Sequence, residues 1–245
     1  MKSVLITGAN RSIGFETARQ FLRRDFFVFL GSRDLSRGLE AAHRLRQEGL
    51  NASEAIQMDV SDDASVEAAR RQIGNRIDAL DVLVNNAGIS GGLPQTATEA
   101  SLDQFQKVFD TNLFGVVRVT QAFVDLMRNS TAPRIVNVSS SMGSLTLHSD
   151  PSWKYYNIKA AAYLPSKSAL NMYTITLAYE LRDTAFKVNV VDPGFIATDF
   201  NNFRGTGTVQ EAADRVIKLA MLGPDGPSGQ FFSEEHDPVH GSIPW

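Results

Sequence analysis

The sequence contains no cysteine, which excludes disulfide bonds and thiolate metal sites. It also has no apolar run approaching the roughly 18 residues that a membrane-spanning helix needs. After Lys2, the run Val4-Leu5-Ile6 is too short for the core of a signal peptide. Basic residues are not in excess: the net charge is −3, whereas proteins that bind nucleic acid or anionic membranes are normally basic. These absences predict a cytoplasmic protein that binds neither nucleic acid nor membrane.

Apolar residues make up 43% of the 245 positions and charged residues 21%, as is usual for a globular protein. Short apolar runs alternate with amphipathic stretches, which predicts an α/β fold: one doubly wound parallel sheet of about seven strands with helices on both faces. The length allows one large domain or two small ones. Because no repeat, linker or low-complexity tract divides the sequence, we expect a single domain over residues 1–245.

The patterns also predict where the elements begin and end. Strands are expected at about residues 3–6, 26–31, 55–58, 82–85, 134–139, 187–192 and 229–232. Helices are expected at about 12–24, 35–48, 62–77, 102–128, 166–182 and 209–222. Residues 101–104 and 208–211 match the capping box, in which a hydroxyl and a side chain three residues later satisfy each other's backbone donors. Pro165 is tolerated only in a first helical turn, which places that helix start close to Tyr163.

Two loops that follow strand ends are expected to bind ligands, because open parallel sheets bind them beyond the carboxyl ends of the strands. Residues 89–100 are rich in Gly, Ser and Thr. Residues 194–207 have the length and composition of a mobile lid, with Phe195, Phe200 and Phe203 interspersed.

Tyr163 and Lys167 are four residues apart, so on a helix they lie on one face. The unperturbed pKa of each side chain is about 10. A phenolate and an ammonium stabilise each other's charge, so we expect Lys167 to lower the pKa of Tyr163. A phenol whose pKa is moved toward neutrality can act as a general acid or base.

A glycine-containing turn, Gly8 to Gly14, lies between an apolar strand and a helix near the amino terminus. Such a turn lets backbone N–H groups and a helix N-terminus approach the pyrophosphate of a dinucleotide. The alternative is an ordinary strand-to-helix turn, against which the flanking strand and helix argue. Together with the Tyr-Lys pair, the turn suggests an oxidoreductase.

The end of the second strand predicts which dinucleotide is bound. NAD sites carry an acidic side chain about 20 residues after the glycine turn, whereas an Arg accommodates the 2′-phosphate of NADP. Here Ser32 stands at the acidic position and Arg33 follows, with Arg11 in the turn expected near the same end of the nucleotide. We predict NADP(H), unless both guanidinium groups are simply solvated surface charges.

A set of motifs in this sequence resembles those of the short-chain dehydrogenase/reductase family, in the family's order and near its spacings. The resemblance spans nearly the whole chain and implies a Rossmann fold. The carboxyl-terminal segment 242–245 also resembles that of carbonyl reductases within the family. The motifs are Thr7-Gly8 to Gly14, Asp59-Val60, Asn85-Asn86-Ala87-Gly88, Asn112, Val138-Ser139-Ser140, Tyr163-x-x-Ser166-Lys167 and Pro193-Gly194.

The resemblance implies a role for each matched residue. Tyr163 would give a proton to a substrate carbonyl, while Lys167 would hold the nicotinamide ribose. Ser140 would hydrogen-bond the substrate oxygen, and Asn112 would position a water that feeds protons toward Lys167. The other cofactor contacts would come from the turn, the adenine end and two later strand ends: Gly8, Asn10, Arg11, Ser12, Ile13, Gly14, Ser32, Arg33, Asp59, Val60, Asn86, Ala87, Gly88, Pro193, Gly194, Ile196 and Thr198.

Two features depart from the family's pattern. Ser12 replaces a glycine of the turn, and a serine has less access to positive φ. The segment between Ser140 and Tyr163 is longer than usual, and we expect it to form one wall of the substrate pocket. It could also alter the helix packing through which relatives assemble, so monomer, dimer and tetramer all remain open.

The four histidines, His43, His148, His236 and His240, have no partner at metal-site spacing, and we expect no metal. His148 could reach the substrate pocket. The partner is expected to be a small carbonyl or alcohol. Phe195, Phe200, Phe203, Trp153 and Tyr156 would suit an apolar or aromatic substrate, or would serve in packing.

Two other functions fit the same fold. A non-catalytic cofactor sensor or scaffold would not need Ser140, Tyr163 and Lys167 together. Dehalogenation of halohydrins in relatives goes with a lost nucleotide site and an Arg at the lysine position, so Lys167 argues against it.

Overall fold

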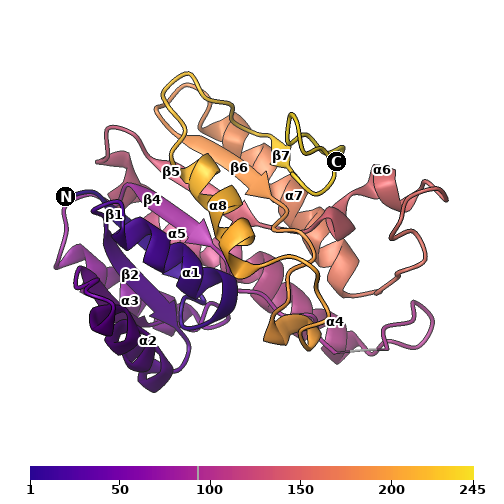
Figure 1. Ribbon diagram of the computed structural model, residues 1–245, viewed down its shortest axis with the longest axis horizontal. Coiled ribbons are helices and arrows are strands. Elements are labelled where there is room, and N and C mark those ends of the chain that lie inside the picture. The colour runs from indigo at the N-terminus through magenta and orange to yellow at the C-terminus, as the bar shows by residue number, and fades with distance from the viewer. Residues whose placement is uncertain (93) are drawn as a thin grey trace.

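A parallel sheet of seven strands forms the centre of the protein in the computed structural model, which describes residues 1–92 and 94–245. The strand order is β3-β2-β1-β4-β5-β6-β7 (Figure 1). The strands are β1 Ser3–Thr7, β2 Phe27–Ser32, β3 Ser53–Gln57, β4 Val82–Asn85, β5 Arg134–Val138, β6 Lys187–Val191 and β7 Phe231–Phe232. The predicted doubly wound α/β fold is confirmed.

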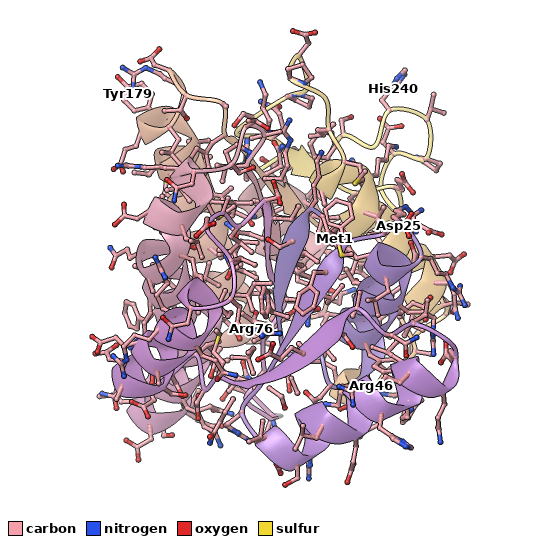
Figure 2. The ribbon with its side chains drawn as sticks, turned by 90° about the vertical axis from the view of Figure 1, so that its left-hand side faces the viewer. Met1, Asp25, Arg46, Arg76, Tyr179 and His240 are labelled. Carbon is pink, nitrogen blue, oxygen red and sulfur yellow. The ribbon has the colours of Figure 1, made fainter. Side chains whose placement is uncertain are left out.

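Helices cover both faces of the sheet. The longer ones are α1 Ser12–Leu22, α2 Leu35–Gln47, α3 Asp63–Gly74, α4 Leu102–Phe109, α5 Gly115–Arg128, α7 Tyr163–Glu180 and α8 Val209–Ala220. Short turns are the π-helical η1 Asp110–Phe114, the 3-10 helices η2 Ser141–Gly143 and η3 Asp199–Asn201, and α6 Leu145–His148. Figure 2 shows the strands passing between the two helical layers, with Arg46 of α2 and Tyr179 of α7 at opposite sides.

Two apolar cores, one on each face of the sheet, hold the layers together. On one face α1, α2 and α8 pack through residues such as Phe21, Leu45 and Val216. On the other, α3, α5 and α7 pack through residues such as Ile73 and Phe123. Because β2 contributes alternate residues to both cores, its sequence is apolar at nearly every position rather than alternating.

The chain reverses direction across the sheet between β3 and β4. The first three strands build outward from β1, and β4 then pairs with the other side of β1. Ligands of doubly wound sheets bind outside the carboxyl ends of the strands at this reversal, here the ends of β1 and β4. The candidate residues of the sequence lie in the segments that follow these and neighbouring strands.

Several predicted boundaries differ from the structure. The helix expected over 102–128 is divided by the wider η1 turn. The helix expected over 166–182 begins at Tyr163, which confirms the start that Pro165 predicts. In the expected loop 89–100, position 93 lies outside the described residues. Among the described residues, no helix combines the length and apolar character needed to cross a bilayer.

The predicted capping box at the start of α8 is present in full. The Thr208 hydroxyl accepts from the Glu211 N–H, and the Glu211 carboxylate accepts from the Thr208 N–H at 2.7 Å. The other box is half formed: Ser101 accepts from the Gln104 N–H, but the Gln104 amide donates to the Gly91 carbonyl instead. Gln104 therefore supports the 89–100 loop rather than its own helix.

Replacing Thr208 by Ala should lower the free energy of unfolding by about 1 kcal/mol, because two first-turn contacts of α8 are lost. Urea denaturation measures this. Thr206→Ala is the matched control, since Thr206 is exposed on the same loop and its hydroxyl makes no hydrogen bond among residues 1–92 and 94–245. Equal losses in both variants would contradict the capping role.

Candidate active site

The first turn of α7 is built against the 89–100 loop. The Gln95 side-chain carbonyl accepts from the N–H groups of Ala162, at 3.1 Å, and Tyr163, at 3.0 Å. The helix has no cap from Ala162 itself, so Gln95 supplies the acceptor that its first turn needs. Gln95 is 4% exposed, and sequence reasoning did not single it out.

Lys167 lies one turn further along α7 and is 5% exposed. Its ammonium donates to the carbonyl of Val138, the last residue of β5, at 3.0 Å. The same nitrogen lies 5.9 Å from the centroid of the Tyr163 ring. Burial lowers the pKa of Lys167 to about 8, because the charged form loses water that one carbonyl replaces only in part.

The prediction that Lys167 lowers the pKa of Tyr163 is wrong for this structure. Burial raises the pKa of the phenol well above its usual value, and the nearby Asp192 carboxylate raises it further. The nearby Ser140 hydroxyl opposes this rise. Because the Lys167 ammonium is directed at Val138, desolvation outweighs any help that it gives to the phenolate.

Ser140 differs from its two neighbours in where its hydroxyl lies. Ser139 is buried and donates to Asn171 of α7 at 2.7 Å. Ser140 accepts from the Met142 N–H at 3.2 Å and lies beside Tyr163. The structure therefore brings together Ser140, Tyr163 and Lys167 at the carboxyl end of β5.

Asn112 occupies the π-helical turn η1 and is fully buried. Its amide donates to the Ile89 carbonyl and to the Ser166 hydroxyl, while its carbonyl accepts from the Ile89 N–H. A Cβ added at Gly88 would lie 3.4 Å from the Asn112 carbonyl and 3.7 Å from the Lys167 ammonium. These contacts bring Asn112 and Gly88 to the Tyr-Lys pair, and π-helical turns are common at functional sites.

The glycine turn after β1 has no room for larger side chains. Gly8 has a φ of +65°, and a Cβ at Gly14 would lie 2.5 Å from the Gly8 carbonyl. The Asn86 amide braces the turn by donating to the Thr7 and Gly8 carbonyls. The first turn of α1 has no acidic residue and no side-chain cap, so its N–H groups suit a phosphate. Asn10, Arg11, Ser12 and Ile13 complete the turn, which fits the pyrophosphate of a dinucleotide.

The carboxyl end of β2 lies next to this turn, and that of β3 lies beyond β2 along the same end of the sheet. Ser32 is buried and its hydroxyl donates to the Asp34 carbonyl at 2.7 Å, whereas Arg33 is exposed. Asp59 accepts from the N–H and hydroxyl of Ser61. Val60 is buried, and Asn86, Ala87 and Gly88 follow β4. These residues surround the place expected for the adenosine half of a dinucleotide.

The segment after β6 crosses toward the glycine turn. Pro193 accepts from Arg215, Gly194 has a φ of +87°, and Ile196 and Thr198 are buried. The next residue, Asp199, forms an ion pair with Arg11 and accepts from the Ser12 hydroxyl at 2.5 Å. Arg11 was expected at the adenosine end, but the structure directs it to Asp199, a residue that sequence reasoning missed.

The model of the short chain dehydrogenase family matches residues 2–208. The chain is a short-chain dehydrogenase/reductase. A (+)-neomenthol dehydrogenase from Arabidopsis thaliana is 34% identical, over 94% of this chain and 95% of the relative. The structure of an NADPH-bound carbonyl reductase from chicken fatty liver has a TM-score of 0.84 at 26% identity, covering 100% of this chain and 99% of that one. A 3-oxoacyl-[acyl-carrier protein] reductase with bound NAD from Brucella melitensis has a TM-score of 0.80 at 31% identity, covering 94% and 88%.

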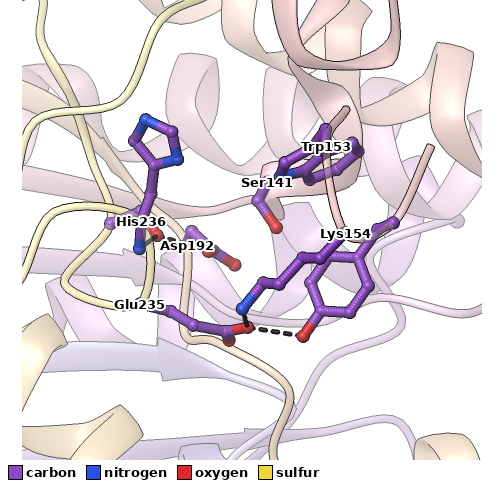
Figure 3. A pocket seen from close by; sticks show the side chains of 8 residues that line it. Ser141, Trp153, Lys154, Asp192, Glu235 and His236 are labelled. Atoms are coloured by element: carbon purple, nitrogen blue, oxygen red, sulfur yellow. Dashed lines mark hydrogen bonds and ion pairs between the residues drawn. The ribbon is translucent and has the colours of Figure 1, made fainter. Parts of the chain in front are cut away.

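This short-chain dehydrogenase/reductase also has a polar cavity of about 220 Å³ beside the end of β6 (Figure 3). At its edge the Glu235 carboxylate accepts from the Lys154 ammonium at 2.6 Å and the Tyr155 hydroxyl at 2.5 Å. The other Glu235 oxygen accepts from the Phe195 N–H at 2.6 Å. Glu235 thus joins the long 141–162 segment to the loop that follows Gly194.

The buried Asp192 carboxylate lines the same cavity. It accepts from the Ser233 hydroxyl at 2.7 Å and from the Gly194 N–H at 3.1 Å. Burial raises the pKa of Asp192, and these hydrogen bonds oppose the rise. Asp192 thus lines the cavity and also acts on Tyr163, because its negative charge raises the pKa of the phenol.

The expectation that the 141–162 segment forms one wall of a pocket agrees with this cavity, which Trp153, Lys154 and Tyr155 line. His148 does not line it. The His148 ring packs edge-on against Trp153 at 4.7 Å, and its Nδ1 lies 3.0 Å from the Lys159 ammonium. Burial and this neighbouring charge lower the pKa of His148 to about 4.

The free energy of unfolding should fall as the pH drops from about 6.5 to about 4. In that window the unfolded chain binds a proton at His148 that the folded protein excludes, so protonation favours unfolding. In His148→Phe, which keeps an aromatic ring against Trp153, the fall should be smaller. Urea titrations at pH 7, 5.5 and 4 measure both slopes, and parallel curves would contradict the assignment.

Proposed function

We propose that this protein reduces a ketone or aldehyde to an alcohol with NADPH, and that Tyr163 delivers the proton. The observation that carries the proposal is the grouping of the Tyr163 phenol with the Ser140 hydroxyl, one helical turn from the buried Lys167 ammonium. A cofactor sensor or scaffold would not require these three groups together. The relatives named above, a neomenthol dehydrogenase and a carbonyl reductase, point to the same class of chemistry.

The proposed proton transfer uses two hydrogen-bond donors that would both bind the carbonyl oxygen of the substrate. The Ser140 hydroxyl and the Tyr163 phenol would donate to the carbonyl oxygen, stabilising the negative charge that develops on it. Bound NADPH supplies the hydride that reduces the carbonyl carbon. The Tyr163 proton then moves to the oxygen, which leaves an alcohol and a phenolate.

The raised pKa of Tyr163 keeps the phenol protonated at neutral pH, which is the form that donates a proton to a carbonyl oxygen. The phenolate left behind has the Lys167 ammonium as its nearest cation on α7, which favours charge separation in the product state. Alcohol oxidation would use the same groups in reverse, starting from the phenolate.

Asn112 and Lys167 are proposed to return a proton to the phenolate. The Asn112 carbonyl accepts from the Ile89 N–H at 2.9 Å and keeps a second lone pair, which can hold a water. With a pKa of about 8, Lys167 can give up a proton near neutral pH. Lys167 is also proposed to bind the nicotinamide ribose, next to Gly88.

The end of β2 supports NADP(H) over NAD(H). Ser32 offers no carboxylate to ribose hydroxyls, and Arg33 is exposed where a 2′-phosphate would bind. The nearby Asp34 carboxylate caps α2 by accepting from the Ser36 N–H at 2.9 Å, which commits it to the helix. The comparisons include both an NADPH-bound and an NAD-bound relative, so the choice rests on these side chains.

Tyr163→Phe should reduce kcat with a carbonyl substrate by at least about 100-fold, because the proton donor is lost. The Kd for NADPH, measured by fluorescence titration, should stay within a factor of two or so, since the phenol hydroxyl is not needed to hold the phosphates. Tyr179→Phe is the matched control, because Tyr179 lies exposed near the other end of α7. Turnover retained in Tyr163→Phe would end its assignment as proton donor.

Arg33→Ala should lower kcat/KM with NADPH by about 10- to 100-fold, the loss of a charge-assisted bond to phosphate. The kcat/KM with NADH should change little, so the ratio of kcat/KM for NADPH to kcat/KM for NADH should fall. Steady-state kinetics with both cofactors measure it. Arg46→Ala, at an exposed arginine near the end of α2, controls for the change in net charge. A wild-type preference for NADH would refute the cofactor assignment.

A further inference from the structure

Ser12 adopts a backbone conformation that glycine reaches without strain. Its φ is +50°, in the left-handed region, at the start of α1. A serine there carries a steric cost that glycine does not have. Its hydroxyl donates to one Asp199 oxygen at 2.5 Å, and the Arg11 guanidinium pairs with the other oxygen. Both oxygens of a single carboxylate are therefore held by the proposed phosphate-binding turn.

Asp199 belongs to the loop 196–207, whose two ends are joined by backbone contacts. Ile196 and Gly207 form a β-bridge, and the Ala197 N–H donates to the Gly207 carbonyl at 3.0 Å. Within the loop, the Asn201 amide donates to the Ile196 carbonyl at 2.8 Å. These bonds fix the shape of the loop, and Asp199 extends from it to the start of α1.

The partners of Asp199 are those that a phosphate would use. A hydroxyl and a guanidinium at a helix N-terminus bind phosphate oxygens through the same charge-assisted hydrogen bonds as they give a carboxylate. The contact is also accessible, because the side chains of Arg11 and Asp199 are 63% and 31% exposed. A phosphate group can therefore reach both donors once the carboxylate withdraws.

We propose that Asp199 sets the affinity for the dinucleotide by competing with its phosphates for Ser12 and Arg11. This inference rests on the proposed function, in which the glycine turn binds NADP(H). The carboxylate occupies the donors while the site is free and repels phosphate while it remains there. Asp199 is thus an affinity-determining residue that weakens cofactor binding. Ser12 contributes to this effect because its hydroxyl holds the Asp199 carboxylate at the turn.

The test is the Kd for NADPH of Asp199→Asn, measured by fluorescence titration without a carbonyl substrate. Removing the charge should tighten binding by about fivefold or more, because the loss of an exposed ion pair at the upper end of its range already gives about fivefold and the charge-assisted hydrogen bond is weakened as well. Asp199→Ala should tighten it as well, so that the result does not depend on the asparagine amide. Asp225→Asn removes the same charge from an exposed turn after α8 and should leave the Kd unchanged.

The Arg11 part of the effect is tested by a double variant. In an Arg11→Ala background, Asp199→Asn should tighten NADPH binding less than it does in the wild type, because one of the released donors is missing. An equal gain in both backgrounds would overturn the role given to Arg11.

The outcomes separate this inference from the proposed function. If the wild type binds NADPH and Asp199→Asn binds it equally or more weakly, the carboxylate does not compete and this inference alone is overturned. A weaker complex would mean that Asp199 closes over the cofactor instead. If neither the wild type nor any Asp199 variant binds NADPH, the proposed function and this inference both fail.

Discussion

The buried ammonium of Lys167 is the group on which the rest of the site depends. An ammonium removed from water must find acceptors inside the protein, and Lys167 finds the Val138 carbonyl at 3.0 Å. That bond ties α7 to the end of β5, where Ser140 follows Val138 in the chain. Gln95 holds the start of the same helix at Tyr163. The phenol, the hydroxyl and the cation meet at one edge of the sheet because these contacts leave α7 little freedom to shift.

Local patterns were sufficient to predict the sheet, most helices and the Thr208 capping box, because each depends on neighbouring residues. They could not predict the η1 turn. Its apolar periodicity resembles an ordinary helix over 102–128, and the turn coincides with contacts of Asn112 to Ile89 and Ser166, 23 and 54 positions away. The apolar pattern alone started α7 at 166, whereas Pro165 placed the start close to Tyr163, where Gln95 of another loop accepts from the backbone N–H.

The partners of long charged side chains were also beyond the reach of sequence patterns. The four-residue spacing suggested that Lys167 would face the phenol, yet its flexible chain turns to a backbone carbonyl. Likewise Arg11 pairs with Asp199, and the Ser12 hydroxyl meets the same carboxylate 187 positions along the chain. The sequence shows that Ser12 replaces a glycine, but only the fold shows that its hydroxyl contacts Asp199. Sequence motifs therefore predicted which residues come together at the site, but not which partners their charged groups bind.

Glu235 lies beyond the residues that match the family model, which end at 208. Even so, it holds Lys154 and Tyr155, which line the cavity beside the catalytic candidates, and it accepts from the backbone N–H of Phe195. The long 141–162 segment and the carboxyl-terminal residues thus depend on each other, since exchanging one without the other leaves a carboxylate or an ammonium without its counter-charge. A change in either segment therefore reshapes the wall of this cavity, while the contacts of the glycine turn on the other side of the site stay as they are.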